Sequence, residues 1–227
     1  MPEDLPREEV LLVIDRSIDE LLEEAGVACP PVDAVVLAKR HPVLAETLEK
    51  RLSRAKATPD EMDPDELQWI AATVVGDDAK PIILRHLGID PADRRPLTGE
   101  SLSSLYATRL LLPEACFPCD AAECAFDLLA LKDRYRTASH ERIAFRLLDL
   151  PEPCVITIVD NDEVYKRKSN AWRVSKELAA AEKKCQRYVS EHRKVGEARG
   201  GKWRVQGWPV PHSMWNRVVL RSVFEGE

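Results

Sequence analysis

Residues 154–167 read CVITIVDNDEVYKR, and this stretch decides the fold class. An apolar run rich in Val and Ile is followed by a polar turn at Asp160-Asn161-Asp162 and by a second run that alternates in polarity. This pattern is typical of a β-hairpin. Two further strands are predicted over 203–206 and 217–224, with a turn at Gly200-Gly201 before them. The C-terminal part of the chain is therefore predicted to form a lobe of strands.

Upstream of Pro151 the apolar residues recur at helical spacing. A first helix is predicted over 7–25, ending at Gly26, and a short second helix over 32–38, with Asp33 placed to cap it. Further helices are predicted over 64–75, over 81–87 before Gly88, over 98–112, from Asp120, and from Ser139; the charged stretch 174–198 permits another. Helices followed by strands predict an α+β fold.

The amino-acid composition is that of a globular protein. The 227 residues are 44% apolar and 32% charged, which fits one large globular domain or a domain with an appended lobe. The sequence shows no run approaching 18 apolar residues and no secretory signal, so a cytoplasmic protein without a membrane contact is expected.

Charge is distributed unevenly along the chain. Residues 1–163 carry 18 Lys and Arg against 33 Asp and Glu, whereas residues 164–227 carry 15 against 6. A basic lobe that is solvated or docks on an acidic body explains this asymmetry, and a nucleic-acid contact is the alternative.

Three of the six cysteines form a short cluster in the sequence, Cys116-x-x-Cys119 and Cys124. A structural zinc site normally has four ligands, and the sequence offers no second Cys-x-x-Cys or His pair to complete this one. Reduced thiols are expected, and the role of the three cysteines stays open.

Three stretches together resemble the ImmA/IrrE-type zinc metallopeptidase family. They are residues 21–38, with a proline-led second helix; the segment YATRLLLP at 106–113; and residues 135–150, with an Arg-Leu pair in a Ser-capped helix. The resemblance implies a helix-rich, zincin-like domain over residues 1–160. Residues 161–227 are then a basic, β-containing C-terminal extension packed on that domain.

Members of that family hold zinc with a His-Glu-x-x-His helix, in which two histidines four residues apart bind the metal and the glutamate acts as general base. In the matching stretch, Thr73 stands at the first histidine, Val74 at the glutamate and Asp77 at the second histidine. The third, acidic ligand falls on Leu102, with Glu100 two residues away. Asp77 and Glu100 are the remaining metal candidates, so the resemblance implies neither bound zinc nor catalysis.

The predicted function is therefore that of a catalytically inactive, metallopeptidase-like protein that acts as a regulatory or protein-binding module. Its expected partner is a protein or peptide segment in the vestigial cleft. One alternative is an active zinc metallo-endopeptidase with unconventional ligands, drawn from Asp77, Asp78, His86 and Glu100.

The other alternative is a regulator that binds nucleic acid through residues 164–227. Near Lys202, Arg204 and Arg217, three tryptophans form a candidate stacking platform: Trp203, Trp208 and Trp215. Such aromatic residues are more often packing anchors.

The pair His140-Glu141 resembles the start of a His-Glu-x-x-His motif, but it lacks the second histidine. It is predicted to start a helix.

Overall fold

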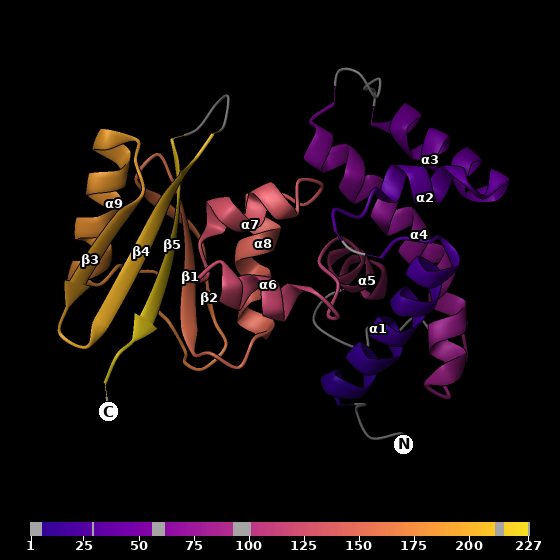
Figure 1. The fold of residues 1–227 in the computed structure, drawn as a ribbon, viewed down its shortest axis with the longest axis horizontal. Helices are drawn as coiled ribbons and strands as arrows, with labels where there is room; N and C mark the ends of the chain where they lie inside the picture. Colours follow the sequence, from indigo (N-terminus) through magenta and orange to yellow (C-terminus); the bar gives the residue numbers. More distant parts are fainter. Residues whose placement is uncertain (1–5, 29, 56–61, 93–100, 212–215, 227) are drawn as a thin grey trace. The chain divides into compact units, whose positions relative to one another are not determined.

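The computed structural model describes residues 6–28, 30–55, 62–92, 101–211 and 216–226. The chain divides into two compact units, of which the first comprises residues 1–123 and 132–139 and the second residues 124–131 and 140–227. The first unit is built of helices and the second around an antiparallel sheet, so the fold is α+β, as the sequence predicts (Figure 1).

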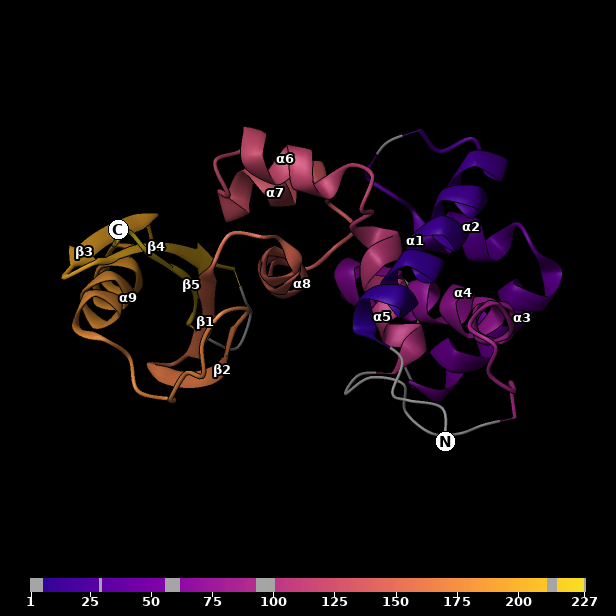
Figure 2. The same cartoon turned by 90° about the horizontal axis from the view of Figure 1, so that it is seen from below.

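Four helices of the first unit, α1, α2, α3 and α5, pack around a long helix, α4. The bounds of the helices are α1 (Arg7–Glu24), α2 (Ala34–Lys39), α3 (Pro42–Arg54), α4 (Pro64–His86), α5 (Leu102–Leu111) and α6 (Phe117–Glu123). Helix α4 contacts α1, α2, α3 and α5, and Figure 2 shows it between α3 and α5. Helix α7 (Leu128–Arg134) is divided between the two units, with residues 128–131 in the second and residues 132–134 in the first.

Local signals at several helix ends are confirmed. Helix α1 ends before Gly26, which has a positive φ of 67° that glycine adopts without strain. Asp33 caps α2 by accepting a hydrogen bond from the Val36 amide at 3.0 Å. Pro64 opens α4 after Asp63, as predicted. Helix α5 begins at Leu102 with Ser101 as its cap, later than the predicted start at Thr98, which lies outside the described residues.

Helix α4 corrects the prediction of two separate helices over 64–75 and 81–87. It runs without interruption for 23 residues, through Gly76 and Pro81, and ends before Gly88. Proline inside a helix removes one backbone hydrogen bond and crowds the preceding turn. Here Ile83 and Leu84, beyond the proline, are buried in the same core as Val75, so tertiary packing outweighs the local penalty.

The predicted helix start at Asp120 is also wrong. Asp120 lies inside α6, and its carboxylate accepts hydrogen bonds from Arg134 and from the Tyr135 hydroxyl, the latter at 2.7 Å. Ala125 and Phe126 adopt positive φ values of 51° and 59°, which end the helical path before α7 begins.

The second unit contains a five-stranded antiparallel sheet in the order β2-β1-β5-β4-β3. The strands are β1 (Cys154–Asp160), β2 (Glu163–Ser169), β3 (Gly196–Gly200), β4 (Trp203–Val210) and β5 (Arg217–Phe224). The predicted hairpin is confirmed, with Asn161 and Asp162 in its turn at positive φ. The division at residue 160 that the resemblance implies lies at the turn of this hairpin, and both paired strands belong to the second unit.

Helices cover both faces of this sheet (Figure 2). Helix α9 (Ala180–His192) packs on β3, β4 and β5, and α8 (His140–Arg146), extended by the 3-10 turn Leu147–Asp149, contacts β1 and β5. Strand β3 was not predicted because small residues replace the usual bulky ones. A Cβ added at Gly196 would lie 2.8 Å from the Tyr188 ring and 2.9 Å from Val189 of α9, so the close helix contact demands glycine.

Candidate functional site

The helix edge singled out in the sequence belongs to α4. Thr73 and Asp77 are four residues apart and lie on the same side of the helix. Thr73 is half-buried and Asp77 is exposed, whereas Val74 is 1% exposed and packs in the core. The position that the resemblance assigns to the general base therefore faces the interior of the unit, away from solvent.

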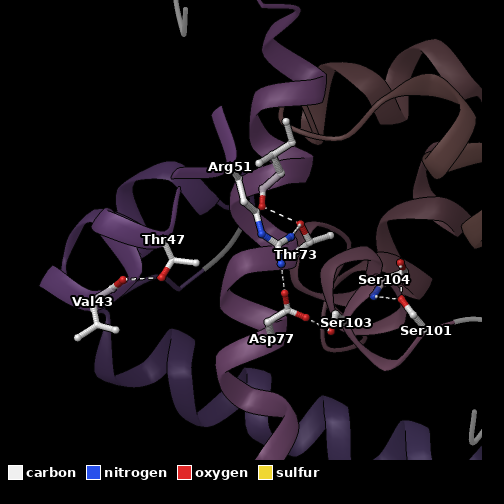
Figure 3. Close-up of polar contacts among 9 residues, drawn as sticks. Val43, Thr47, Arg51, Thr73, Asp77, Ser101, Ser103 and Ser104 are labelled. Atoms are coloured by element: carbon white, nitrogen blue, oxygen red, sulfur yellow. Dashed lines mark hydrogen bonds and ion pairs between the residues drawn. The ribbon is translucent and has the colours of Figure 1, made fainter. Parts of the chain in front are cut away.

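Arg51, which α3 contributes, occupies this edge (Figure 3). Its Nη1 donates to the Thr73 hydroxyl at 3.2 Å, and its Nη2 forms an ion pair with the Asp77 carboxylate. The Thr73 hydroxyl in turn donates to the Ile70 carbonyl oxygen at 2.7 Å. One guanidinium thus contacts both residues that the resemblance places at the histidine positions.

Ser103 of α5 completes the arrangement. Its hydroxyl donates to the second oxygen of the Asp77 carboxylate, so Asp77 joins side chains from two neighbouring helices. We call Arg51, Thr73, Asp77 and Ser103 the Arg51 cluster. It links α3, α4 and α5 around one positive charge.

The chemistry of the Arg51 cluster differs from that of a metal site. A divalent cation needs several free oxygen, nitrogen or sulfur ligands, whereas here both Asp77 oxygens already accept hydrogen bonds. Guanidinium stays protonated at all physiological pH values and has no acceptor, so it does not act as a general base. The described part of the chain contains no group of three His, Cys, Asp or Glu side chains arranged to hold a metal ion.

Asp78 and His86, the other candidate ligands within the described residues, do not form a metal-binding group with Asp77. Glu100 lies outside the described residues, and Leu102 is buried at the start of α5. Asp78 and His86 are exposed on α4, and His86 lies nine residues beyond Asp77, which is about 13 Å along a helix axis.

Sequence reasoning missed Arg51 and Ser103, the two residues that contact Asp77. Helix α3 was not predicted, although Pro42 at its start and the buried Leu44, Leu48 and Leu52 at four-residue spacing are a helix signal. That pattern identifies the helix, but it does not show that Arg51 meets a helix more than twenty residues further along the chain.

The cysteines fall in different parts of the chain. Cys116 and Cys119 belong to the first unit and Cys124 to the second, with Cys119 exposed and the other two half-buried. Burial raises the pKa of Cys185, a fourth cysteine on the buried side of α9, to about 11, so its thiol stays protonated at neutral pH.

Trp203 and Trp208, two of the three tryptophans of the candidate stacking platform, pack against other side chains. Trp208 is 1% exposed, and its indole Nε1 donates to Asp127 at 2.9 Å, which makes it a packing anchor. Trp203 packs edge-on against Trp172 and Phe224 at centroid distances of 5.4 and 5.5 Å. Trp215 lies outside the described residues.

Several basic residues of the C-terminal segment are already paired with carboxylates. Arg217 bonds both oxygens of Asp160 at 2.7 Å, and these bonds raise its pKa. Lys166 pairs with Glu141 at 2.6 Å, and Glu141 lies in the first turn of α8, where a helix start was predicted. Arg204 pairs with Glu197 at 3.1 Å.

Comparison with known proteins gives a fold likeness. No protein-family model matches the chain, and no curated protein matches it. Among solved structures, the chain is similar to a Mycobacterium tuberculosis transcriptional regulator, with a TM-score of 0.57 and 17% sequence identity over 93% of this chain and 75% of that one. At this identity the likeness concerns the fold. Among the described helices, none has the length and apolarity to cross a membrane.

Proposed function

We propose that this chain is a non-catalytic relative of the ImmA/IrrE-type metallopeptidases that acts as a regulatory, protein-binding module. The observation that carries the proposal is the Arg51 guanidinium on the Thr73 and Asp77 side chains. A positive side chain lies on the edge where the resemblance would put a zinc ion, and it links α3 to α4 there. Val74, buried at the position of the general base, supports the same conclusion.

A regulatory role agrees with the fold likeness, because the similar solved protein is a transcriptional regulator. The expected partner is a protein or peptide segment. Nucleic acid is a less suitable partner for residues 164–227, since Lys166, Arg204 and Arg217 are engaged with carboxylates. Binding of oligonucleotides that falls steeply between 50 and 200 mM salt would favour the nucleic-acid alternative.

The first experiment measures metal content and peptidase activity of the purified chain. We expect far less than one zinc per chain by mass spectrometry, and no peptide cleavage that a chelator abolishes. About one tightly bound zinc per chain, together with chelator-sensitive cleavage, would instead establish the enzyme with unconventional ligands.

A second experiment asks whether Arg51 stands in for the metal. The variant Thr73→His/Asp77→His places two histidines at metal-binding spacing, and Val74 is left unchanged because a glutamate there would bury a charge. We expect zinc binding to strengthen when Arg51→Ala is added, since the positive charge beside the site is removed. The matched control is Arg54→Ala, at an exposed position of the same helix. Equal zinc affinity with and without Arg51 would contradict the proposal.

A further inference from the structure

The first unit contains a cavity of about 410 Å³ that is separate from the residues of the Arg51 cluster. Its apolar wall includes Leu22 of α1, Val32 before α2 and Pro113 after α5, all three of them buried. Ala28 and Ala115 line it at exposed positions. A cavity of this volume with a mainly apolar wall is typical of small-molecule binding sites.

The charged side chains that line this cavity are both negative. Asp19 and Glu23 are four residues apart on α1, so the two exposed carboxylates lie on one face of the helix. Among the described residues that line the cavity, none is Lys, Arg or His. A ligand with a positive group would relieve the repulsion between the two carboxylates, and an anionic ligand would increase it.

The end of α1 favours a cation for an independent reason. The C-terminal carbonyl groups of a helix carry partial negative charge, and the cavity lies at this end of α1, beside Gly26 and Val27. A guanidinium already uses this property, because Arg40 Nη1 donates to the Ala25 carbonyl oxygen at 2.7 Å. Two carboxylates and the residues at the end of α1 therefore line one mainly apolar cavity.

We propose that this cavity binds a small molecule that combines an apolar body with one positively charged amine. The apolar body would lie against Leu22, Val32 and Pro113, and the ammonium group would lie near Asp19 and Glu23. This assignment does not use the Arg51 cluster, so the ligand site and the non-catalytic role are independent proposals, and either can be wrong without affecting the other.

The test compares three probes that share a cyclohexyl ring, namely cyclohexylamine, cyclohexanol and cyclohexanecarboxylate, at constant ionic strength. We expect the amine to raise the melting temperature with saturation, the alcohol to do so at higher concentration, and the carboxylate to have no effect. In the variant Asp19→Asn/Glu23→Gln, amine affinity is expected to fall about tenfold while alcohol affinity stays the same. Equal affinity for all three probes, or a preference for the carboxylate, would overturn the proposal.

A cavity-filling variant locates the binding site. Ala115→Trp places an indole at an exposed position of the cavity wall and is expected to abolish the amine-induced shift. Ala122→Trp is the matched control, because Ala122 is an exposed alanine of α6 that does not line the cavity. If circular dichroism shows that Ala115→Trp is unfolded, Ala28→Trp, at another exposed position of the cavity wall, replaces it. An amine shift that persists in a folded cavity-filling variant would place binding elsewhere and overturn the proposal.

Discussion

The two units each contain an arginine paired with a carboxylate, but the two pairs lie in very different surroundings. In the helical unit, the Arg51 and Asp77 side chains are 38% and 41% exposed. In the sheet unit, the side chains of Arg167 on β2 and of Glu182 in the first turn of α9 are 10% and 3% exposed. Water screens the first pair and is largely excluded from the second.

Their hydrogen-bond partners differ in the same way. Glu182 accepts from Arg167 at 2.9 Å, from the Ser222 hydroxyl at 2.7 Å and from the Ala179 amide at 2.8 Å, which ties α9 to the sheet and to its own first turn. The Arg51 cluster joins helices at their solvent side. We infer that the buried pair is required for folding of its unit, whereas the exposed pair can be changed with little effect on stability and is therefore available for function.

The largest effect is expected for Glu182→Ala in the sheet unit. The variant leaves the Arg167 guanidinium and the Ser222 hydroxyl buried without this acceptor, and loss of one partner of a buried ion pair costs about 3–5 kcal/mol. Urea denaturation followed by tryptophan fluorescence measures it, since four of the five tryptophans belong to this unit.

Two further variants serve as its controls. Glu182→Gln keeps an acceptor for Ser222 and is expected to lose less than Glu182→Ala. Glu191→Ala, at an exposed position of α9, is expected to change the free energy of unfolding by less than about 0.5 kcal/mol. A loss below 1 kcal/mol for Glu182→Ala would remove the distinction between the two pairs.

An intermediate effect is expected for Gly76→Ala, beside Asp77 in the helical unit. A Cβ at this position would lie 2.9 Å from the Ser103 carbonyl oxygen and 3.2 Å from the Tyr106 Cβ, so α4 and α5 would have to separate. Overpacking of this kind costs about 1–3 kcal/mol, which exceeds the helix-propensity gain of about 1 kcal/mol for replacing glycine.

Thermal unfolding monitored by circular dichroism measures this loss. Lys80→Ala, at an exposed position of α4, is the control for propensity alone. Stabilisation by Gly76→Ala would mean that the two helices are not held as closely as the Asp77–Ser103 contact requires.

The same comparison explains which parts of the molecule could be predicted from the sequence. Features fixed by neighbouring residues were predicted correctly, such as the end of α1 at Gly26 and the turn of the β1–β2 hairpin. The Thr73–Asp77 edge was also predicted, because four-residue spacing on a helix determines it. Its zinc-free character stays a prediction that the metal measurement will test.

Features fixed by distant residues were not predicted. Continuation of α4 through Pro81 depends on burial of Ile83 and Leu84, and strand β3 depends on the approach of α9 to Gly196. Arg51 reaches Asp77 from 26 positions away in the sequence. In each case the contact that fixes the feature joins residues far apart in the sequence, and local propensity does not reflect such contacts.

The smallest effect is expected for the Arg51–Asp77 pair, and it is the sharpest test of the comparison. A double-mutant cycle with Arg51→Ala and Asp77→Ala is expected to give a coupling energy below about 1 kcal/mol, because both side chains are more than one-third exposed. Raising the salt to 1 M should reduce it further, since the screening length falls to about 3 Å. The corresponding cycle for Arg167 and Glu182 should give a larger coupling that salt changes little. If the Arg51–Asp77 coupling equals that of the buried pair, the Arg51 cluster is a structural element of the helical unit, and its position on the Thr73–Asp77 edge would no longer indicate a lost metal site.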